Sequence, residues 1–177
     1  GVQTCALPIL DVCTGSGCIA ISLAKLGGYT DVTALDLSEE ALKVARSNGE
    51  KLLDQPVKFI KSDMFSALNP EEQYNVIVSN PPYIPSQVIE GLEPEVKDHE
   101  PRMALDGEPD GLKFYRILAE EGKKYLKNGG SIYMEIGWDQ AKDVTEIFEA
   151  MGFSGLRTVR DMAVNNDTSR HMGQTYC

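Results

Sequence analysis

The chain has 177 residues, which is enough for one domain with a full-sized hydrophobic core. Hydrophobic residues make up 42% of it and charged residues 25%, as in ordinary globular proteins, and the net charge of -10 argues against a broad nucleic-acid-binding surface. No apolar run approaches the length of a membrane span. The four cysteines form no C-x-x-C pair and have no partnering histidines, which argues against zinc and fits a reducing, cytoplasmic compartment.

The first nine residues show neither helical nor strand periodicity. They resemble the conceptual translation of a sequencing adapter more than a natural protein start. We therefore expect residues 1–9 to be a non-native leader and residues 10–177 to form one domain, and we exclude the leader from functional interpretation. In that case the native chain is longer, with a further domain upstream.

From Ile9 onward, predicted strands and helices alternate. Short, β-branched apolar runs predict strands at 9–13, 31–35, 57–60 and 74–78. Helices are predicted over 18–26 and after Ser38, which can cap a helix with two acids in its first turn. Repeated strand–helix–strand units imply a parallel sheet covered on both faces. The expected buried face of the second helix consists of Ala41, Val44, Ala45 and Leu52.

The C-terminal half is predicted to contain two more helices and one more strand. One helix is expected to end at Asn128-Gly129-Gly130, before a strand over 131–136. Trp138, after this strand, is expected to cover the core. Apolar residues at helical spacing mark the cores of the two helices: Leu112, Tyr115, Ala119, Gly122 and Leu126 in the first, and Ala141, Val144, Phe148 and Met151 in the second.

The turn Asn80-Pro81-Pro82-Tyr83 follows the fourth predicted strand. Proline cannot donate to a sheet ladder, so the strand must end there, at the edge of an open α/β sheet where ligands bind. The side-chain oxygen of Asn80 and the carbonyl of Pro81 can accept two hydrogen bonds from one planar NH2 group, while Tyr83 offers an aromatic face. We therefore expect an amide or an exocyclic base amine as the substrate. The alternative is a strand-terminating loop without chemistry.

Three further strand ends carry groups that suit an adenosine ligand. Thr14-Gly15-Ser16-Gly17 is a glycine loop before a helix, where backbone N–H groups can approach a ligand closely. Asp36, about twenty residues further on, lies where a carboxylate accepts both ribose hydroxyls. Asp63 can accept from the adenine amine, and Met64 can pack against the ring. Each has a structural alternative, as a common turn, a helix-capping acid or a solvated acid, but their order on consecutive strand ends favours a ligand site.

Two stretches together resemble a known family. Asp11-Val12-Cys13-Thr14-Gly15-Ser16-Gly17, with Asp36 and Asn80-Pro81-Pro82-Tyr83, resembles the class I methyltransferases that use S-adenosyl-L-methionine (AdoMet). Glu-Pro-Arg-Met-Ala-Leu-Asp-Gly at 100–107, followed by 110–116, is similar to the protein-glutamine N-methyltransferases that modify peptide chain release factors. Base methyltransferases share the turn but usually lack this second stretch. The resemblance implies a Rossmann-like α/β fold, with a seven-stranded sheet, helices on both faces and an antiparallel last strand.

The resemblance also implies an activity and a role for each motif. The activity is transfer of a methyl group from AdoMet to the side-chain amide nitrogen of the glutamine in a release factor's Gly-Gly-Gln loop. The protein partner would be the release factor, and neither a membrane nor direct nucleic-acid binding is expected. The implied cofactor-binding residues are Cys13, Thr14, Gly15, Ser16, Gly17, Asp36, Asp63, Met64 and Asn80. The implied substrate-binding residues are Asn80, Pro81, Pro82 and Tyr83, and Asn80, Pro81 and Tyr83 are the implied catalytic residues.

The implied chemistry needs alignment more than it needs a base. The methyl group on the sulfonium is already activated, and the proton on nitrogen can leave after transfer. Alignment of the two reactants can lower the activation barrier by about 7–11 kcal/mol. His99 and His171 fit no base or ligand pattern, and no metal is expected. Cys13 stands where the family often has glycine. Residues 161–170 follow the family's C-terminal pattern only loosely, so the last strand that the resemblance implies near 170–176 is either present or poorly formed. The long loop over 84–109 is expected to line the side of the site where the substrate binds.

Two other functions remain open on the sequence alone. An adenine amino methyltransferase acting on DNA or RNA would use the same acceptors, although the acidity and the 100–116 stretch count against it. A non-catalytic or NAD-binding Rossmann domain would fit Gly15-x-Gly17-x-x-Ala20, a loose dinucleotide-binding pattern. That alternative leaves the Asn80–Tyr83 turn unexplained.

Overall fold

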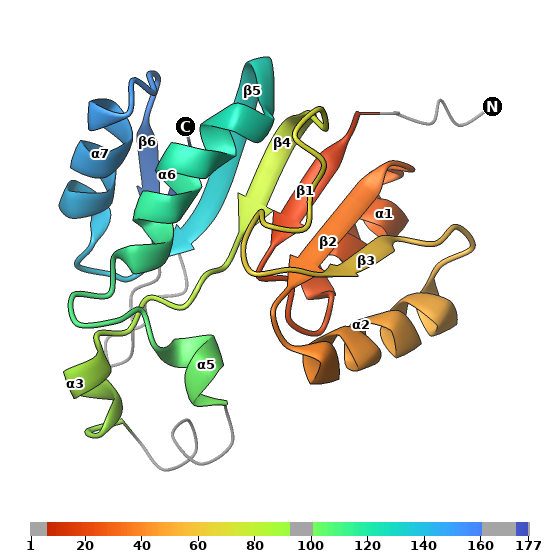
Figure 1. Ribbon diagram of the computed structural model, residues 1–177, viewed down its shortest axis with the longest axis horizontal. Helices are drawn as coiled ribbons and strands as arrows, with labels where there is room; N and C mark the ends of the chain where they lie inside the picture. Colours follow the sequence, from red (N-terminus) through yellow and green to blue (C-terminus); the bar gives the residue numbers. More distant parts are fainter. Residues whose placement is uncertain (1–6, 93–100, 161–172, 177) are drawn as a thin grey trace. The chain divides into compact units, whose positions relative to one another are not determined.

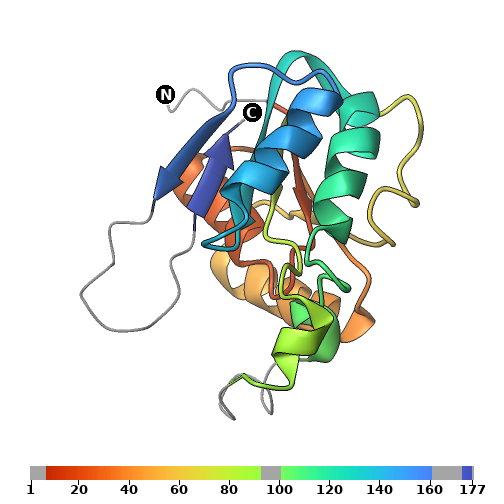
Figure 2. The same cartoon turned by 90° about the vertical axis from the view of Figure 1, so that its left-hand side faces the viewer.

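The computed structural model describes residues 7–92, 101–160 and 173–176 of the chain. The described residues fall into two compact units, one drawn from 1–79 and 121–132 and the other from 80–120 and 133–177. Figure 1 labels the helices and strands, and Figure 2 shows their course after a turn of 90° about the vertical axis.

The first unit is built on four parallel strands. They are β1 (Ile9–Val12), β2 (Val32–Asp36), β3 (Lys58–Lys61) and β4 (Tyr74–Ser79), and they lie in the order β3-β2-β1-β4 (Figure 1). In register, Val12 pairs with Leu35 on one side and with Ser79 on the other. All four predicted strands are therefore confirmed to within one or two residues. Because the strands are parallel, their carboxyl ends share one edge of this sheet.

Buried aliphatic residues hold these strands together. All four residues of β1 are buried, as expected for a strand covered on both faces. One core cluster joins these strands to the first helix, and each buried isoleucine or valine side chain in it contributes about 1.5–3 kcal/mol. The buried residues of the cluster are Ile9, Ala20, Val32, Ala34 and Val57.

The two helices of the first unit follow β1 and β2. They are α1 (Cys18–Gly27) and α2 (Glu39–Leu52), and the predicted cap of α2 is confirmed, because Ser38 Oγ accepts from Ala41 N at 3.1 Å. The predicted buried face of α2 was partly wrong. Ala45 is buried as expected, but Val44 and Leu52 are 51% and 49% exposed. The face is instead completed by Leu42 and Gly49.

The next helix and strand have residues in both units. They are α6 (Lys113–Tyr125) and β5 (Leu126–Ile136). The prediction that the helix ends at 128–130 was wrong, because β5 already begins at Leu126. Gly130 marks a close approach of two strands, not a helix end: a Cβ there would lie 2.8 Å from the carbonyl oxygen of Asn75.

The second unit contains α7 (Ala141–Ala150), which lies beside α6 (Figure 2). Val144 and Phe148 are buried, as the helical spacing predicted, whereas Met151 is 42% exposed. Trp138 is 66% exposed, so the prediction that it covers the core was wrong. Two strands complete this unit, β6 (Arg157–Arg160) and β7 (Gly173–Tyr176), and β7 pairs antiparallel with both β5 and β6.

Several sequence-based expectations fall outside the described residues, namely His99, His171 and the 161–170 segment. Across the stretches that the structure does describe, no helix is long and apolar enough to cross a membrane.

Candidate active site

The glycine loop between β1 and α1 contains a position where both the backbone and the packing favour glycine. Gly17 precedes α1 with a φ of 81°, in the left-handed region that favours glycine. A Cβ at Gly17 would also lie 3.0 Å from the Ala45 Cβ, so the position is restricted by packing as well. The loop is held from α2, because Asn48 Nδ2 donates to the Ser16 carbonyl at 3.1 Å.

Asp36, at the end of β2, is hydrogen-bonded to residues that follow β1, β2 and β3. Its Oδ2 accepts from Gly15 N at 2.7 Å, and its Oδ1 accepts from Ser38 N at 2.8 Å. Its carbonyl oxygen accepts from Ser62 N, just after β3, at 2.9 Å. The structure thus brings the predicted ribose-binding acid into direct contact with the predicted glycine loop, and each carboxylate oxygen keeps a lone pair for a further donor.

Cys13 and Met64 meet beside this loop. Both have a positive φ, 62° and 46°, and the Cys13 Sγ donates to the Met64 Sδ at 3.8 Å. The pKa of the Cys13 thiol is raised to about 12, first by burial and then by the nearby charges of Asp36 and Asp11. Cys13 is therefore a neutral thiol at physiological pH and lines the loop without acting as a nucleophile.

Asp11, in the middle of β1, is a site residue that the predicted set missed. It is fully buried; its Oδ2 accepts from Thr14 Oγ1 at 2.6 Å and from Ala20 N at 3.1 Å, whereas its Oδ1 has no hydrogen-bond partner among the described residues. Burial raises the pKa of this carboxyl from 3.8 to about 7. The signal in the sequence was an acid inside an otherwise apolar strand.

Asp63 completes a group of three acids around the glycine loop. Its side chain is exposed, and its carbonyl oxygen accepts from Ser66 N at 3.0 Å. The negative charges of Asp36, Asp11 and Asp63 all act on Cys13 and raise its pKa. A site with this charge distribution favours a ligand that carries positive charge.

The turn Asn80–Tyr83 belongs to the second unit and begins one peptide bond after β4. Asn80 is exposed, both prolines are buried, and Tyr83 is partly buried. Among the described residues, none makes a hydrogen bond to the Asn80 side chain. Ser79, before the turn, is held by its Oγ, which donates to the Val12 carbonyl at 2.8 Å. The exposed carboxamide of Asn80 is thus presented on a stiff backbone.

The segment after the turn was expected to be a long loop, and its described part is more ordered than that. It contains two short helices, α3 (Ser86–Ile89) and α5 (Arg102–Leu105), and a parallel bridge between Ile84 and Asp106. Main-chain hydrogen bonds from Ile84 N to the Leu105 carbonyl at 3.0 Å and from Gly107 N to the Ile84 carbonyl at 2.9 Å fasten the bridge.

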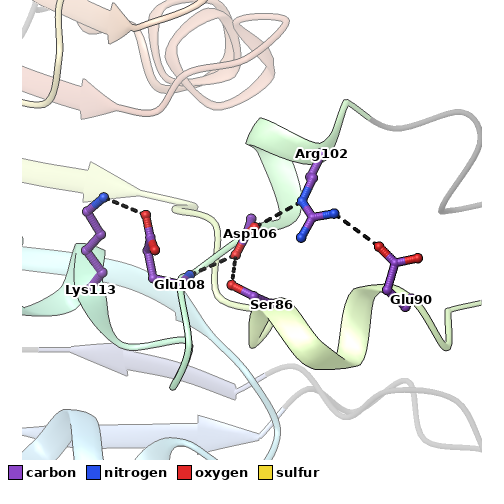
Figure 3. A network of polar contacts seen from close by, with 6 residues as sticks. All are labelled: Ser86, Glu90, Arg102, Asp106, Glu108 and Lys113. Carbon is purple, nitrogen blue, oxygen red and sulfur yellow. Dashed lines mark hydrogen bonds and ion pairs between the residues drawn. The ribbon is translucent and has the colours of Figure 1, made fainter.

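The carboxylate of Asp106 is the centre of a polar network in this segment (Figure 3). Its Oδ1 accepts from Ser86 Oγ at 2.6 Å and from Glu108 N at 3.0 Å, and its Oδ2 accepts from Arg102 Nε at 3.2 Å. The hydrogen bond from Ser86 is the main reason why the pKa of Asp106 lies below its usual range. Arg102 Nη1 also pairs with Glu90, the residue that follows α3, at 3.1 Å, so one acid and one arginine connect α3 and its C-terminal end with α5.

The residues of the predicted site are divided between the two units. In the first unit, the structure brings together the glycine loop, Asp36 and Met64, with Asp63 on the adjoining turn. In the second unit, the Asn80–Tyr83 turn is packed against the segment that the resemblance singled out. In the described parts of the chain, no three acidic, histidine or cysteine residues are grouped so as to hold a metal ion.

Solved structures of low sequence identity share this fold. A methyltransferase from Pyrococcus furiosus aligns with a TM-score of 0.69 at 22% identity, over 97% of this chain and 75% of that one. TrmN from Thermus thermophilus aligns with a TM-score of 0.63 at 18% identity, over 97% of this chain and 43% of that one. The α/β fold is that of the class I methyltransferases. More narrowly, residues 3–91 match the model of the methyltransferase small domain, and the chain belongs to this family.

The chain is also similar to curated proteins named release factor glutamine methyltransferase. The protein of Caulobacter vibrioides is 43% identical over 162 residues, which are 91% of this chain and 56% of the relative. That of Thermodesulfovibrio yellowstonii is 43% identical over 155 residues, 88% of this chain and 55% of the relative. The chain spans about half the length of the curated relatives it matches.

Proposed function

We propose that this chain transfers a methyl group from AdoMet to the side-chain amide nitrogen of the glutamine in the Gly-Gly-Gln loop of a peptide chain release factor. The observation that carries the proposal is the exposed Asn80 carboxamide, on a turn stiffened by two buried prolines and joined directly to β4. The names of the 43% identical relatives support the release factor as substrate.

The first unit fits AdoMet better than it fits a dinucleotide. AdoMet supplies a methyl group that is activated by its bond to a sulfonium, and it carries an ammonium group as well. The unpartnered Oδ1 of Asp11 and the neighbouring acids suit such a cationic ligand, whereas they would repel the pyrophosphate of NAD. We assign the cofactor to Cys13, Thr14, Gly15, Ser16, Gly17, Asp36, Asp63, Met64 and Asn80, and add Asp11.

The turn would act on the substrate amide by holding its nitrogen still. The Asn80 oxygen and the Pro81 carbonyl accept the two N–H bonds, which fixes the NH2 group and leaves its lone-pair face open. These two acceptors also stabilise the positive charge that grows on nitrogen during transfer. Alignment of this kind can lower the activation barrier by about 7–11 kcal/mol, so the chain needs no strong base. Tyr83 packs against the amide plane, next to Pro82.

The proposal also covers the complete sheet, the cellular compartment and the binding partner. We propose the complete class I sheet of seven strands, which the strand order β3-β2-β1-β4-β5-β7-β6 supports, within a methyltransferase domain over 10–177. The proposed setting is the cytoplasm, where release factors act in translation termination. The proposed partner is a protein, and the net charge of -10 supports the exclusion of a nucleic-acid partner.

The decisive experiment offers labelled AdoMet and two substrates side by side, a release factor and adenine-containing DNA. Label should appear on the release factor and should disappear when its Gly-Gly-Gln glutamine is replaced. Label on DNA alone would establish the adenine amino methyltransferase in its place. Tight binding of NAD without binding of AdoMet, measured by calorimetry, would instead support the dinucleotide-binding alternative.

A further inference from the structure

The backbone of Tyr83, at the end of the Asn80–Tyr83 turn, is enclosed by two glycines. A Cβ at Gly107 would lie 2.9 Å from both the Cα and the carbonyl carbon of Tyr83, closer than real Cβ atoms come. A Cβ at Gly111, whose φ is 72°, would overlap the Tyr83 carbonyl oxygen. Both glycines lie in the stretch after the turn that the sequence singled out, so this stretch forms a close-fitting wall against the turn's main chain.

A third residue, Gln140, completes this enclosure from the β5–α7 connection. Its side-chain amide nitrogen donates to the Tyr83 carbonyl at 2.9 Å and to the Gly111 carbonyl at 3.3 Å. Its side-chain oxygen accepts from Gly137 N at 2.9 Å. With 6% exposure, Gln140 is one of the few buried polar side chains in the described part of the chain, and both of its N–H donors are used.

The backbone of Gln140 is fixed as firmly as its side chain. Its N–H donates to the Gly137 carbonyl at 3.0 Å, and its carbonyl accepts from Val144 N at 2.9 Å, in the first turn of α7. A carboxamide held on a helix start and a tight turn has little freedom to follow a moving partner. Gln140 therefore sets the position of the Tyr83 carbonyl.

Fixing Tyr83 has consequences for the whole turn. The rings of Pro81 and Pro82 lock their own φ angles, and each proline also restricts the residue before it. Few free torsions then separate Asn80 from Tyr83. A carbonyl held at Tyr83 thus limits where the Asn80 carboxamide and the Pro81 carbonyl can point.

We infer that Gln140 is a positioning residue for methyl transfer: through the Tyr83 carbonyl it holds the two acceptors of the turn in the geometry that the substrate amide requires. This inference rests on the proposed function. Misplacement of a reacting group by about 1 Å can cost about 100-fold in rate. Loss of the Gln140 hydrogen bonds should therefore lower kcat more than it changes the KM for a protein substrate, because most of that substrate's contacts lie elsewhere.

The test compares Gln140→Met with Thr145→Val. Methionine has a similar size but cannot donate, whereas Thr145→Val removes a hydrogen bond of 2.7 Å to the Ala141 carbonyl in the same helix, away from the turn. We expect kcat per AdoMet-binding site to fall about 10- to 100-fold in Gln140→Met, with KM and the AdoMet Kd within about twofold of the wild type. Thr145→Val should keep the wild-type kcat. Gly111→Ala, which pushes on the same Tyr83 oxygen, should reproduce the loss of kcat.

A second measurement does not depend on catalysis. Hydrogen exchange over residues 84–92 should be faster in Gln140→Met than in Thr145→Val, because Tyr83 is no longer held. A wild-type kcat in Gln140→Met, or an equal loss in Thr145→Val, would overturn the inference and leave the proposed function intact. If the wild-type chain binds AdoMet but methylates no release factor, the proposed function fails. Faster hydrogen exchange in Gln140→Met would then still support the claim that Gln140 fixes the Tyr83 carbonyl. Unchanged exchange would overturn that claim as well.

Discussion

The buried carboxyl of Asp11 makes a prediction about how the stability of this protein depends on pH. Its pKa is about 7 in the folded chain and 3.8 without the fold, and the main cause is burial. A group whose pKa is raised by folding binds more protons in the folded state between these two values. The free energy of unfolding must therefore fall as the pH rises from about 4 to about 7.

The magnitude follows from the size of the shift. A rise of the pKa from 3.8 to about 7 corresponds to about 4 kcal/mol. Asp11→Asn removes the titration and keeps an oxygen for the hydrogen bonds from Thr14 and Ala20. Its buried NH2 group costs about 1–3 kcal/mol, but that cost is the same at every pH. The stability of Asp11→Asn relative to wild type should hence rise by about 4 kcal/mol between pH 4 and pH 8.

Urea unfolding followed by circular dichroism, repeated at intervals from pH 4 to pH 8, measures this difference. Trp138 is 66% exposed and would be a weak fluorescent reporter of unfolding. Asp139→Asn makes the same chemical change at an exposed position and gives the background. Parallel stability curves for wild type and Asp11→Asn across this pH range would refute the assignment of a raised pKa to Asp11.

Three further substitutions test the site. Asn80→Ala should lower methyl transfer by about 100-fold or more but weaken AdoMet binding, measured by calorimetry, by no more than about twofold, because Asn80 is only one of several residues assigned to the cofactor; loss of both together would make Asn80 a structural residue. Asp36→Ala should weaken AdoMet binding by about tenfold or more, and an unchanged Kd would contradict the ribose assignment. Cys13→Val should lower the free energy of unfolding by about 2 kcal/mol, because a β-branched residue is strained at a φ of 62°, and Cys13→Gly should lower it by less. The opposite order in urea unfolding would mean that side-chain packing outweighs backbone strain.

The strands and the site-bearing turns of the first unit could be predicted because their signals are local. Short β-branched runs ended by glycine, aspartate or proline are typical of strands in a parallel sheet, and Ser38 caps α2 as its residue type predicts. The buried face of α2 could not be predicted in the same way. Gly49 is part of that face because the ring of Phe59 covers it, at 3.3 Å from where a Cβ would lie, and a glycine adds nothing to a hydrophobic pattern.

The errors of prediction in the second half of the chain arise from contacts between distant segments. Gly129-Gly130 has the composition of a helix end, but Gly130 is required where Asn75 approaches from β4. Gln140 carries no motif of its own, and its importance appears only when Tyr83 and Gly111 are seen to converge on it. Asp11 could have been found from the sequence, because an acid within a buried strand is rare unless it is hydrogen-bonded or serves a ligand.

The two prolines of the turn also bear on how glutamine could be told from glutamate. Pro81 and Pro82 have no N–H, so the main chain between Asn80 and Tyr83 offers carbonyl oxygens but no donors of its own. A glutamine amide brings two N–H donors to these oxygens, whereas an ionised glutamate brings only further negative charge. Under the proposed function, the chain would reject glutamate by electrostatic repulsion from oxygens already in place, with no side chain dedicated to that purpose.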